Sequence, residues 1–373
     1  MATGDSFYFR PVMQTQQAIS EHRFAVIGSG SWATALAKIL SDNGHAINWY
    51  VRNRHIGEHL LRFQHNPSYL SSARFNSQKL LLHYEPAAAI SAADTVILSI
   101  PSAYVEEVLD ALPRNAFAGK KVVSAIKGIM PRNNVLLNDK LRQEFDFDVN
   151  DYYTIMGPCH AEEVASEKLS YLTFSGLDDS GAQWLADQFR NHYINTVTNT
   201  DIYGVQFAAI LKNIYALGSG IAHGLEYGDN FQSVLIANAA DEMAGFLRKV
   251  GIRNIEVGVH KEPIPGVQLL KSGTYRKSAN YAASVYLGDL LVTCYSLYSR
   301  NRTFGNMIGK GYSVKTAQLE MNMVAEGYNA CRSLYQINQE VKADLPIATT
   351  VYRILWEQLP PAEGFRQIEE TMI

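Results

Sequence analysis

Short apolar runs alternate with amphipathic stretches in the first half of the chain. The first run is Phe24–Ile27, and in the segment after it Ala33, Leu36 and Leu40 share one helical face. Further β-rich runs cover residues 46–51, 94–100, 121–126, 153–156, 171–175 and 194–198, with helical patterns at 103–112 and 181–191. This alternation predicts a doubly wound α/β sheet over about the first 200 residues.

The pattern changes near residue 199, where long helical stretches replace the β-rich runs. The expected helices cover residues 202–221, 232–250, 284–297, 314–322 and 323–336, and the last expected helix covers residues 348–358. A loop with Pro263 and Pro265 interrupts them. The second half is therefore expected to be a helical unit that packs against the ligand edge of the sheet.

The turn after the first run has the pattern Gly-x-Gly-x-x-Ala, with Gly28, Gly30 and Ala33 at the marked positions. The two glycines lack the Cβ atoms that would keep a ligand from the backbone, and the next helix offers free N–H groups to an anion. A strand before this motif and a helix after it are typical of a turn that binds a dinucleotide pyrophosphate. An ordinary glycine-rich turn would also match the bare motif.

The end of the second run is where a dinucleotide-binding sheet contacts the adenosine ribose. An acidic residue there would select NAD, whereas this chain has Arg52 and Arg54 on either side of Asn53. Guanidinium groups can face a 2′-phosphate, so we expect NADP to be accepted alongside NAD. Solvated loop arginines are the alternative interpretation.

The length, charge and hydrophobic content of the chain limit the kinds of function that it can have. The chain has 373 residues, 47% hydrophobic and 18% charged, which is enough to bury the cores of two domains. The net charge of -3 and the lack of a Lys/Arg run give no sign of a nucleic-acid partner. No apolar run approaches the roughly 20 residues that span a bilayer.

The cysteines and the N-terminus indicate a cytoplasmic protein. Cys159, Cys294 and Cys331 are widely spaced, which argues against a disulfide framework or a zinc site and fits a reducing compartment. Residues 1–21 lack the layout of a secretory signal, so we interpret them as an extension of unknown role.

Lys212 is the most informative residue of the second half. It shares a helical face with Val205, Ala208, Tyr215 and Ser219, which places an ammonium group on a largely small and apolar stripe. A lysine held away from water has its pKa lowered toward neutrality, as a general acid or base requires. The alternative is a surface lysine whose stem covers apolar area.

Two polar groupings follow along the chain. Asp289, Thr293 and Ser296 stand at i, i+4 and i+7, so a carboxylate on that face could orient a lysine or a substrate hydroxyl. Asp289 could equally sit near the positive end of a helix dipole. Residues 299–302, Ser-Arg-Asn-Arg, are donors of the kind that bind a phosphate, with a solvated basic loop as the alternative.

Six short segments, in this order, resemble the signature of the bacterial NAD(P)-dependent sn-glycerol-3-phosphate dehydrogenases. They lie at residues 28–32, 127–128, 157–158 with 161–163, 211–213, 288–290 with 293–294, and 299–302 with 304–305. The resemblance extends from about Phe24 to Leu355. It implies a Rossmann sheet followed by an all-α domain like that of 6-phosphogluconate dehydrogenases, and reversible NAD(P)H-dependent reduction of dihydroxyacetone phosphate for glycerophospholipid synthesis.

The resemblance also implies a division of the chain and a role for single residues. We expect an extension at residues 1–21, a Rossmann domain at 22–198, and a substrate-binding and homodimerisation domain at 199–373. Lys212 would be the proton donor and acceptor, and no metal is implied. The substrate would be held by Lys127, Gly157, Asn213, Asp289, Thr293, Ser299, Arg300 and Asn301, with Arg300 and Asn301 at its phosphate. The cofactor would be contacted by Gly28, Gly30, Ser31, Trp32, Arg52, Tyr69, Lys127, Ala161, Arg300, Val324 and Glu326.

The chain departs from the family pattern after Gly157-Pro158. The family commonly has serine and then an apolar or aromatic residue there, whereas this chain has Cys159 and His160. The contact that the family makes through the side chain of residue 159 is therefore in doubt in this chain. A nucleophilic Cys159 assisted by His160 is an alternative. However, two residues that are adjacent in sequence do not for that reason form a Cys/His dyad.

Two other functions compete with the one that the resemblance implies. A related two-domain dehydrogenase of another 2-oxo or 3-hydroxy compound, such as ketopantoate or a hydroxyacyl-CoA, would have no need of the donors at residues 299–302. A dinucleotide-binding protein with a decayed site should have lost Lys212 or Asp289, and both are present.

Overall fold

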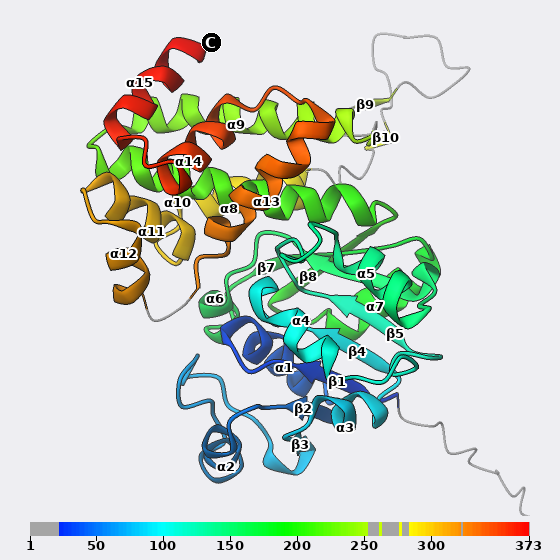
Figure 1. Ribbon diagram of the computed structural model, residues 1–373. Coiled ribbons are helices and arrows are strands. Elements are labelled where there is room, and N and C mark those ends of the chain that lie inside the picture. The colour runs from blue at the N-terminus through cyan, green and yellow to red at the C-terminus, as the bar shows by residue number, and fades with distance from the viewer. Residues whose placement is uncertain (1–21, 253–260, 263–275, 278–282, 322–323, 373) are drawn as a thin grey trace, which may run out of the picture.

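The computed structural model describes residues 22–252, 261–262, 276–277, 283–321 and 324–372 (Figure 1). The expected N-terminal extension at residues 1–21 and the loop with Pro263 and Pro265 lie outside the described residues. The described chain forms an α/β part and, above it in the view, a helical part.

The α/β part is built on an eight-stranded sheet with the order β3-β2-β1-β4-β5-β6-β7-β8. Neighbouring strands are parallel except β6 and β7, which are antiparallel, a feature that the apolar pattern did not predict. The direction of crossover reverses beside β1, and such a reversal creates the ligand crevice of a doubly wound sheet. The strands are β1 (Phe24–Ile27), β2 (Ile47–Tyr50), β3 (Leu80–His83), β4 (Thr95–Leu98), β5 (Lys121–Ser124), β6 (Tyr152–Met156), β7 (Ser170–Gly176) and β8 (Ile194–Asn199).

Helices cover both faces of this sheet, which explains why its central strands, such as β1 and β4, are largely apolar. In β1, Phe24 and Val26 belong to one core, while Ala25 and Ile27 belong to the core on the opposite face. The helices are α1 (Ser31–Asp42), α2 (Arg54–Phe63), α3 (Pro86–Ser91), α4 (Ser102–Asp110), α5 (Leu137–Phe145), α6 (Ala161–Ala165) and α7 (Asp179–Phe189), with 3₁₀ turns η1 (Ser77–Lys79) and η2 (Val149–Asp151).

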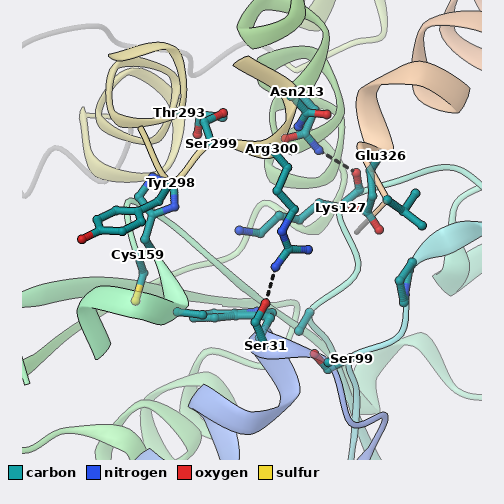
Figure 2. Close-up of a pocket in the computed structure, with 18 of the residues that line it drawn as sticks. Ser31, Ser99, Lys127, Cys159, Asn213, Thr293, Tyr298, Ser299, Arg300 and Glu326 are labelled. Atoms are coloured by element: carbon teal, nitrogen blue, oxygen red, sulfur yellow. Dashed lines mark hydrogen bonds between the residues drawn. The ribbon is translucent and has the colours of Figure 1, made fainter. Parts of the chain in front are cut away.

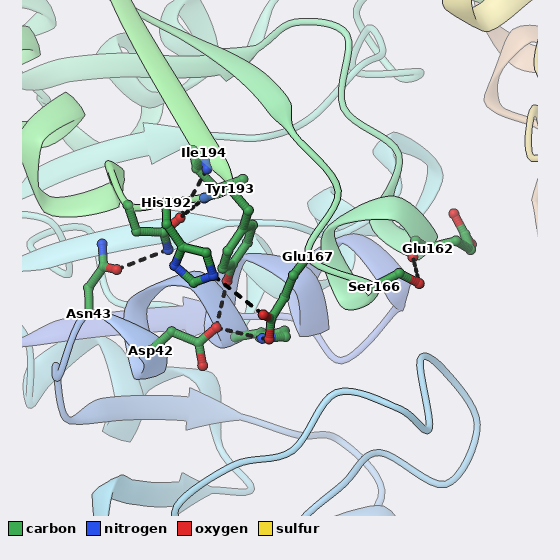
Figure 3. Close-up of polar contacts among 10 residues, drawn as sticks. Asp42, Asn43, Glu162, Ser166, Glu167, His192, Tyr193 and Ile194 are labelled. Carbon is green, nitrogen blue, oxygen red and sulfur yellow. Dashed lines mark hydrogen bonds and ion pairs between the residues drawn. The ribbon is translucent and has the colours of Figure 1, made fainter.

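Ion pairs and a hydrogen bond fasten α1 to the loops that precede β7 and β8, and Figure 3 shows Asp42 of α1 beside Glu167 and Tyr193 of those loops. Lys38 Nζ lies 2.5 Å from Asp42 and 3.0 Å from Glu167, and its side chain is 5% exposed. Tyr193 donates a hydrogen bond of 2.6 Å to the same Asp42 carboxylate. These contacts fix the helix whose N-terminus faces the ligand crevice.

The helical part surrounds α8 (Ile202–Gly224), most of whose residues are buried. The other helices are α9 (Asp229–Lys249), α10 (Asp289–Tyr295), α11 (Arg300–Gly309), α12 (Val314–Glu320), α13 (Glu326–Val341), α14 (Pro346–Trp356) and α15 (Pro361–Thr371). A π-helical turn, η3 (Ala283–Gly288), precedes α10, and the strands β9 (Lys261–Glu262) and β10 (Arg276–Lys277) pair antiparallel.

Two expectations about these helices are wrong. The single helix expected at residues 284–297 is a π-helical turn followed by α10, which ends at Tyr295, so Ser296 is the extended C-cap residue and does not share the helical face of Asp289. The helix at 348–358 is not the last one, because Pro361 starts α15 at a position where proline is well tolerated.

Two glycines let α8 and α11 approach at the level of their backbones. A Cβ atom on Gly220 would lie 2.1 Å from the Arg302 carbonyl oxygen, and one on Gly305 would lie 2.1 Å from that of Leu217. Larger residues would push the helices apart. This close approach holds the first turn of α11 beside the helix that carries Lys212.

Candidate active site

A cavity lies where the carboxyl edge of the sheet meets the helical part (Figure 2). Both parts contribute polar side chains to it. The α/β part contributes Gly30, Ser31, Trp32, Ala33, Ser99, Ile100, Pro101, Ala125, Lys127, Cys159, His160, Ala161 and Glu162. The helical part contributes Lys212, Asn213, Asp289, Thr293, Tyr298, Ser299, Arg300, Asn301, Val324 and Glu326.

The glycine-rich turn leaves room and hydrogen-bond donors for a dinucleotide. Gly28 has φ +125°, and a Cβ atom there would lie 2.3 Å from the Ser99 carbonyl oxygen, so only glycine fits without strain. A Cβ atom on Gly30 would meet no described atom within 4 Å. No side chain caps α1, and the buried Trp32 Nε1 has no hydrogen-bond partner among the described residues. The turn therefore fits a dinucleotide.

Lys212 and Asp289 form a buried ion pair at the helical side of the cavity, and each residue is 2% exposed. Burial lowers the pKa of Lys212 to about 8, and the charge of Lys127 acts in the same direction. The Asp289 carboxylate opposes this shift and favours the ammonium form. The pair thus gives a lysine that can release or accept a proton near neutral pH.

Lys127 enters the cavity from the segment after β5. Its ammonium nitrogen lies 5.2 Å from the centroid of the Trp32 ring, and Asn213 Nδ2 donates a hydrogen bond of 3.2 Å to its carbonyl oxygen. Figure 2 shows Asn213 on α8 above Lys127, with this hydrogen bond dashed. The bond ties the helix that carries Lys212 to the sheet edge.

The first turn of α11 presents a guanidinium group to the dinucleotide turn. Ser299 caps the helix by accepting a hydrogen bond of 3.3 Å from the Arg302 N–H. Arg300 donates a hydrogen bond to Ser31 Oγ across the cavity (Figure 2), and Asn301 Oδ1 accepts one of 2.9 Å from the Gly327 N–H. A helix N-terminus combined with an arginine favours an anion at this place.

Glu326 joins α13 to the sheet side of the cavity. Its carboxylate accepts a hydrogen bond of 3.2 Å from the Ser102 N–H at the start of α4, and burial raises its pKa. The carboxylate thus stabilises the N-terminus of α4 and holds the two parts of the chain together at this edge.

Four of the predicted site residues do not line this cavity: Gly28, Arg52, Tyr69 and Gly157. Tyr69 borders a neighbouring hollow together with Ser31. Gly157 has φ +124°, and a Cβ atom there would lie 2.8 Å from the Tyr171 carbonyl oxygen, so this glycine shapes the turn after β6. The other predicted residues line the cavity.

The two arginines after β2 differ in their surroundings. Both side chains are exposed, but the Arg54 guanidinium lies 4.5 Å from the centroid of the Tyr84 ring. Asn53 caps α2 by accepting a hydrogen bond from the His55 N–H. Arg52 therefore remains the better candidate for a 2′-phosphate contact.

Several lining residues were not predicted as site residues from the sequence. Ala125 follows a strand, so the position of the strand end could have indicated it, but Tyr298 carries no such signal. Cys159 lines the cavity with a buried thiol whose pKa burial raises to about 12. A thiol that stays protonated is a poor nucleophile, so the geometry gives the nucleophilic interpretation no support.

The described residues contain no group of three or more His, Cys, Asp or Glu side chains that could hold a metal ion. In the same part of the chain, no helix combines the length and apolar character needed to cross a bilayer.

Comparison with known protein families shows which family the chain belongs to. Residues 23–182 match the family described as NAD-dependent glycerol-3-phosphate dehydrogenase N-terminus, and residues 201–366 match its C-terminus. The chain belongs to the NAD-dependent glycerol-3-phosphate dehydrogenase family. It is therefore an NAD(P)-dependent oxidoreductase, and the resemblance predicted from the six segments is confirmed.

Curated relatives agree with this membership of the glycerol-3-phosphate dehydrogenase family, and a solved structure shares the fold. The glycerol-3-phosphate dehydrogenase [NAD(P)+] of Bacillus cytotoxicus is 31% identical, over 90% of this chain and 91% of that protein. The enzyme of the same name from Oceanobacillus iheyensis is 30% identical over 93% of each chain. The crystal structure of glycerol-3-phosphate dehydrogenase from Coxiella burnetii shares the fold, with a TM-score of 0.80, 24% identity and coverage of 94% of this chain and 99% of that chain.

Proposed function

We propose that this chain catalyses the reversible NAD(P)H-dependent reduction of dihydroxyacetone phosphate to sn-glycerol 3-phosphate and so supplies the glycerophospholipid backbone. The observation that carries the proposal is the buried Lys212–Asp289 pair in one cavity with a dinucleotide turn and Arg300. The relatives named glycerol-3-phosphate dehydrogenase [NAD(P)+] support the choice of substrate.

Lys212 is proposed as the proton donor for the reduction. The reduced nicotinamide, when bound, supplies the hydride that is added to C2 of the substrate. Negative charge develops on the carbonyl oxygen, and Lys212 Nζ donates its proton to that oxygen. In the reverse direction the neutral amine accepts the proton of the C2 hydroxyl. A pKa of about 8 lets one residue serve both directions near neutral pH.

The neighbours of Lys212 adjust its charge and the position of the substrate. Asp289 favours the ammonium form and limits the orientation of Nζ, while Thr293 Oγ1 donates a hydrogen bond of 2.6 Å to the Asp289 carbonyl oxygen. Lys127 is proposed to stabilise the developing oxyanion, because its ammonium group lies in the same cavity. Asn213 would help to place the carbonyl.

The phosphate end is proposed to bind at Arg300 and Asn301, in the first turn of α11. A guanidinium group forms two parallel hydrogen bonds with phosphate oxygens, and the helix N-terminus adds a favourable field. Arg300 also reaches Ser31, so the same side chain would draw the helical part over the cofactor. Binding energy from this non-reacting end would then help to align the carbonyl.

The cofactor contacts are proposed to come from the turn and its surroundings. Gly28, Gly30, Ser31 and Trp32 would hold the pyrophosphate region, and Arg52 a 2′-phosphate. Tyr69, Ala161, Val324 and Glu326 would close around the bound dinucleotide.

We also propose that the chain divides into domains at residues 22–198 and 199–373 and that it forms a homodimer through the helical part. We further propose that it is cytoplasmic and has no nucleic-acid partner. Between β8 and α8 only two residues connect the sheet to the helical part, which supports a boundary near 199. A net charge of -3 without a basic run supports the absence of nucleic acid.

The direct test is the oxidation of NADH and NADPH by the purified protein on addition of dihydroxyacetone phosphate. We expect turnover with this substrate and little with ketopantoate or acetoacetyl-CoA, because neither compound has a phosphate ester on the carbon next to its reacting carbonyl, where Arg300 would bind it. Turnover confined to one of the other two compounds would overturn the proposal in favour of a related dehydrogenase.

A further inference from the structure

His160 occupies a part of the cavity that the proposed reaction leaves unused. It precedes α6 and lines the cavity together with Lys127, Lys212 and Asp289. Its ring centroid lies 6.1 Å from that of Tyr298. The atom Nε2 is buried and has no hydrogen-bond partner among the described residues. A buried polar atom without a partner is costly, and a ligand that supplied one would bind more tightly.

The imidazole is neutral at physiological pH. Burial and the charges of Lys127 and Lys212 together lower the pKa of His160 to about 4. The Asp289 carboxylate acts in the opposite direction but offsets only part of this shift. A neutral ring has one N–H donor and one acceptor nitrogen. A hydroxyl group both donates and accepts, so it can satisfy Nε2 in either tautomer. A charged ligand group gains no ion pair there.

The polar groups of the proposed substrate leave one candidate for this contact. The phosphate is assigned to Arg300 and Asn301, and the carbonyl oxygen to Lys212 and Lys127. The hydroxyl on C1 remains. Cys159 lines the same cavity, but a thiol is a weaker hydrogen-bond partner for a hydroxyl group than an imidazole nitrogen.

We propose that His160 is a specificity-determining residue whose Nε2 hydrogen-bonds the C1 hydroxyl of dihydroxyacetone phosphate. This inference rests on the proposed function and adds the selection of the hydroxymethyl end of the substrate. A site that hydrogen-bonds a substrate hydroxyl discriminates against the analogue that lacks it, because the buried nitrogen is then left unpaired.

The test compares dihydroxyacetone phosphate with hydroxyacetone phosphate, which lacks the C1 hydroxyl, in the parent enzyme and in His160→Phe. We expect kcat/KM of the parent to favour dihydroxyacetone phosphate by about 10- to 100-fold. In His160→Phe this preference should fall to roughly threefold or less, with kcat/KM for the analogue and KM for the dinucleotide little changed. His160→Gln, which keeps a donor and an acceptor, should restore part of the preference.

His223→Phe is the matched control, since this exposed histidine lies in the last turn of α8, away from the cavity. It should keep the parent ratio, and melting temperatures will show that each variant is folded. An unchanged ratio in His160→Phe, or equal losses on both substrates, would overturn the inference while the parent still reduces dihydroxyacetone phosphate. A parent enzyme that does not turn over dihydroxyacetone phosphate would overturn the proposed function and this inference together.

Discussion

Lys212 and Asp289 form an ion pair across the contact of α8 with α10, and neither side chain is more than 3% exposed. Two buried charges lose much of their hydration, and only their mutual attraction and their contacts with neighbouring groups compensate for that loss. Asp289 therefore does more than orient the lysine. It counteracts the burial and the Lys127 charge, which both lower the pKa of Lys212.

The pH dependence of the reaction should follow this balance. Reduction needs the ammonium form of Lys212, so kcat/KM for dihydroxyacetone phosphate should fall as pH rises through about 8. Oxidation of glycerol 3-phosphate needs the amine and should rise over the same range. In Asp289→Asn the carboxylate that raises the pKa is lost, so both transitions should move to lower pH. Asp241→Asn on the exposed face of α9 is the control, and transitions that do not move in Asp289→Asn would contradict the electrostatic role.

Arg300 should act on the phosphate of the substrate. We expect Arg300→Ala to lower kcat/KM for dihydroxyacetone phosphate by about 10- to 100-fold, the range for a charge-assisted hydrogen bond, mainly through KM. Activity with phosphate-free dihydroxyacetone should change far less. The matched control is Arg248→Ala, an exposed arginine at the end of α9. Equal losses with both substrates would show that Arg300 acts on something other than the phosphate.

Arg52 should contribute to the use of NADPH. Its exposed side chain follows β2, whereas Arg54 lies against the Tyr84 ring. We expect Arg52→Ala to reduce kcat/KM for NADPH by about 10-fold with little effect on NADH, because only NADPH carries the 2′-phosphate. Arg54→Ala is the comparison and should have the smaller effect. Parallel losses with the two dinucleotides in Arg52→Ala would be inconsistent with this assignment.

Glu242 should make stability depend on pH. Its buried carboxylate accepts hydrogen bonds of 2.6 Å from the Ile347 N–H and 3.3 Å from the Ala348 N–H, at the start of α14. Burial raises its pKa from 4.5 to about 8, although these two hydrogen bonds oppose the shift. Because the folded-state pKa is the higher one, the stability linked to this proton is present below pH 4.5 and is lost as pH rises through about 8.

Thermal unfolding measured from pH 6 to pH 9 tests this linkage. The melting temperature of the parent should decline over the range, and that of Glu242→Gln should decline less steeply. The other titratable groups that act on the carboxylate, Tyr215 and Asp344, remain in the variant. Identical slopes for the two proteins would show that Glu242 does not carry the effect.

The sheet could be predicted because both of its faces are buried. Phe24–Ile27 is apolar throughout and most of the later runs are largely apolar, a feature that is visible without any partner in space. The pattern could not reveal that β7 runs antiparallel to β6, since strand direction depends on the connecting chain. Nor could it separate the π-helical turn from α10, because Ala283–Gly288 continues the apolar pattern of a helix.

Residues of the candidate site could be predicted where the helical period places a charged side chain on an otherwise apolar face. Lys212 stands out as a charge on an apolar face, and the structure buries it. The contact of Glu326 with Ser102 joins positions far apart in sequence, so no local pattern could predict it. The unpaired Nε2 of His160 depends on how α6 packs beside the helical part, and the sequence shows only an unusual residue there.

The central claim is that Lys212 supplies the proton, and the rate of dihydroxyacetone phosphate reduction by Lys212→Ala tests it most directly. Lys249→Ala, at the exposed end of α9, serves as the control and should match the parent. We expect kcat of Lys212→Ala to be lower by about 10²- to 10⁴-fold, the usual cost of losing a general acid. A folded Lys212→Ala enzyme with near-parental kcat would contradict the claim.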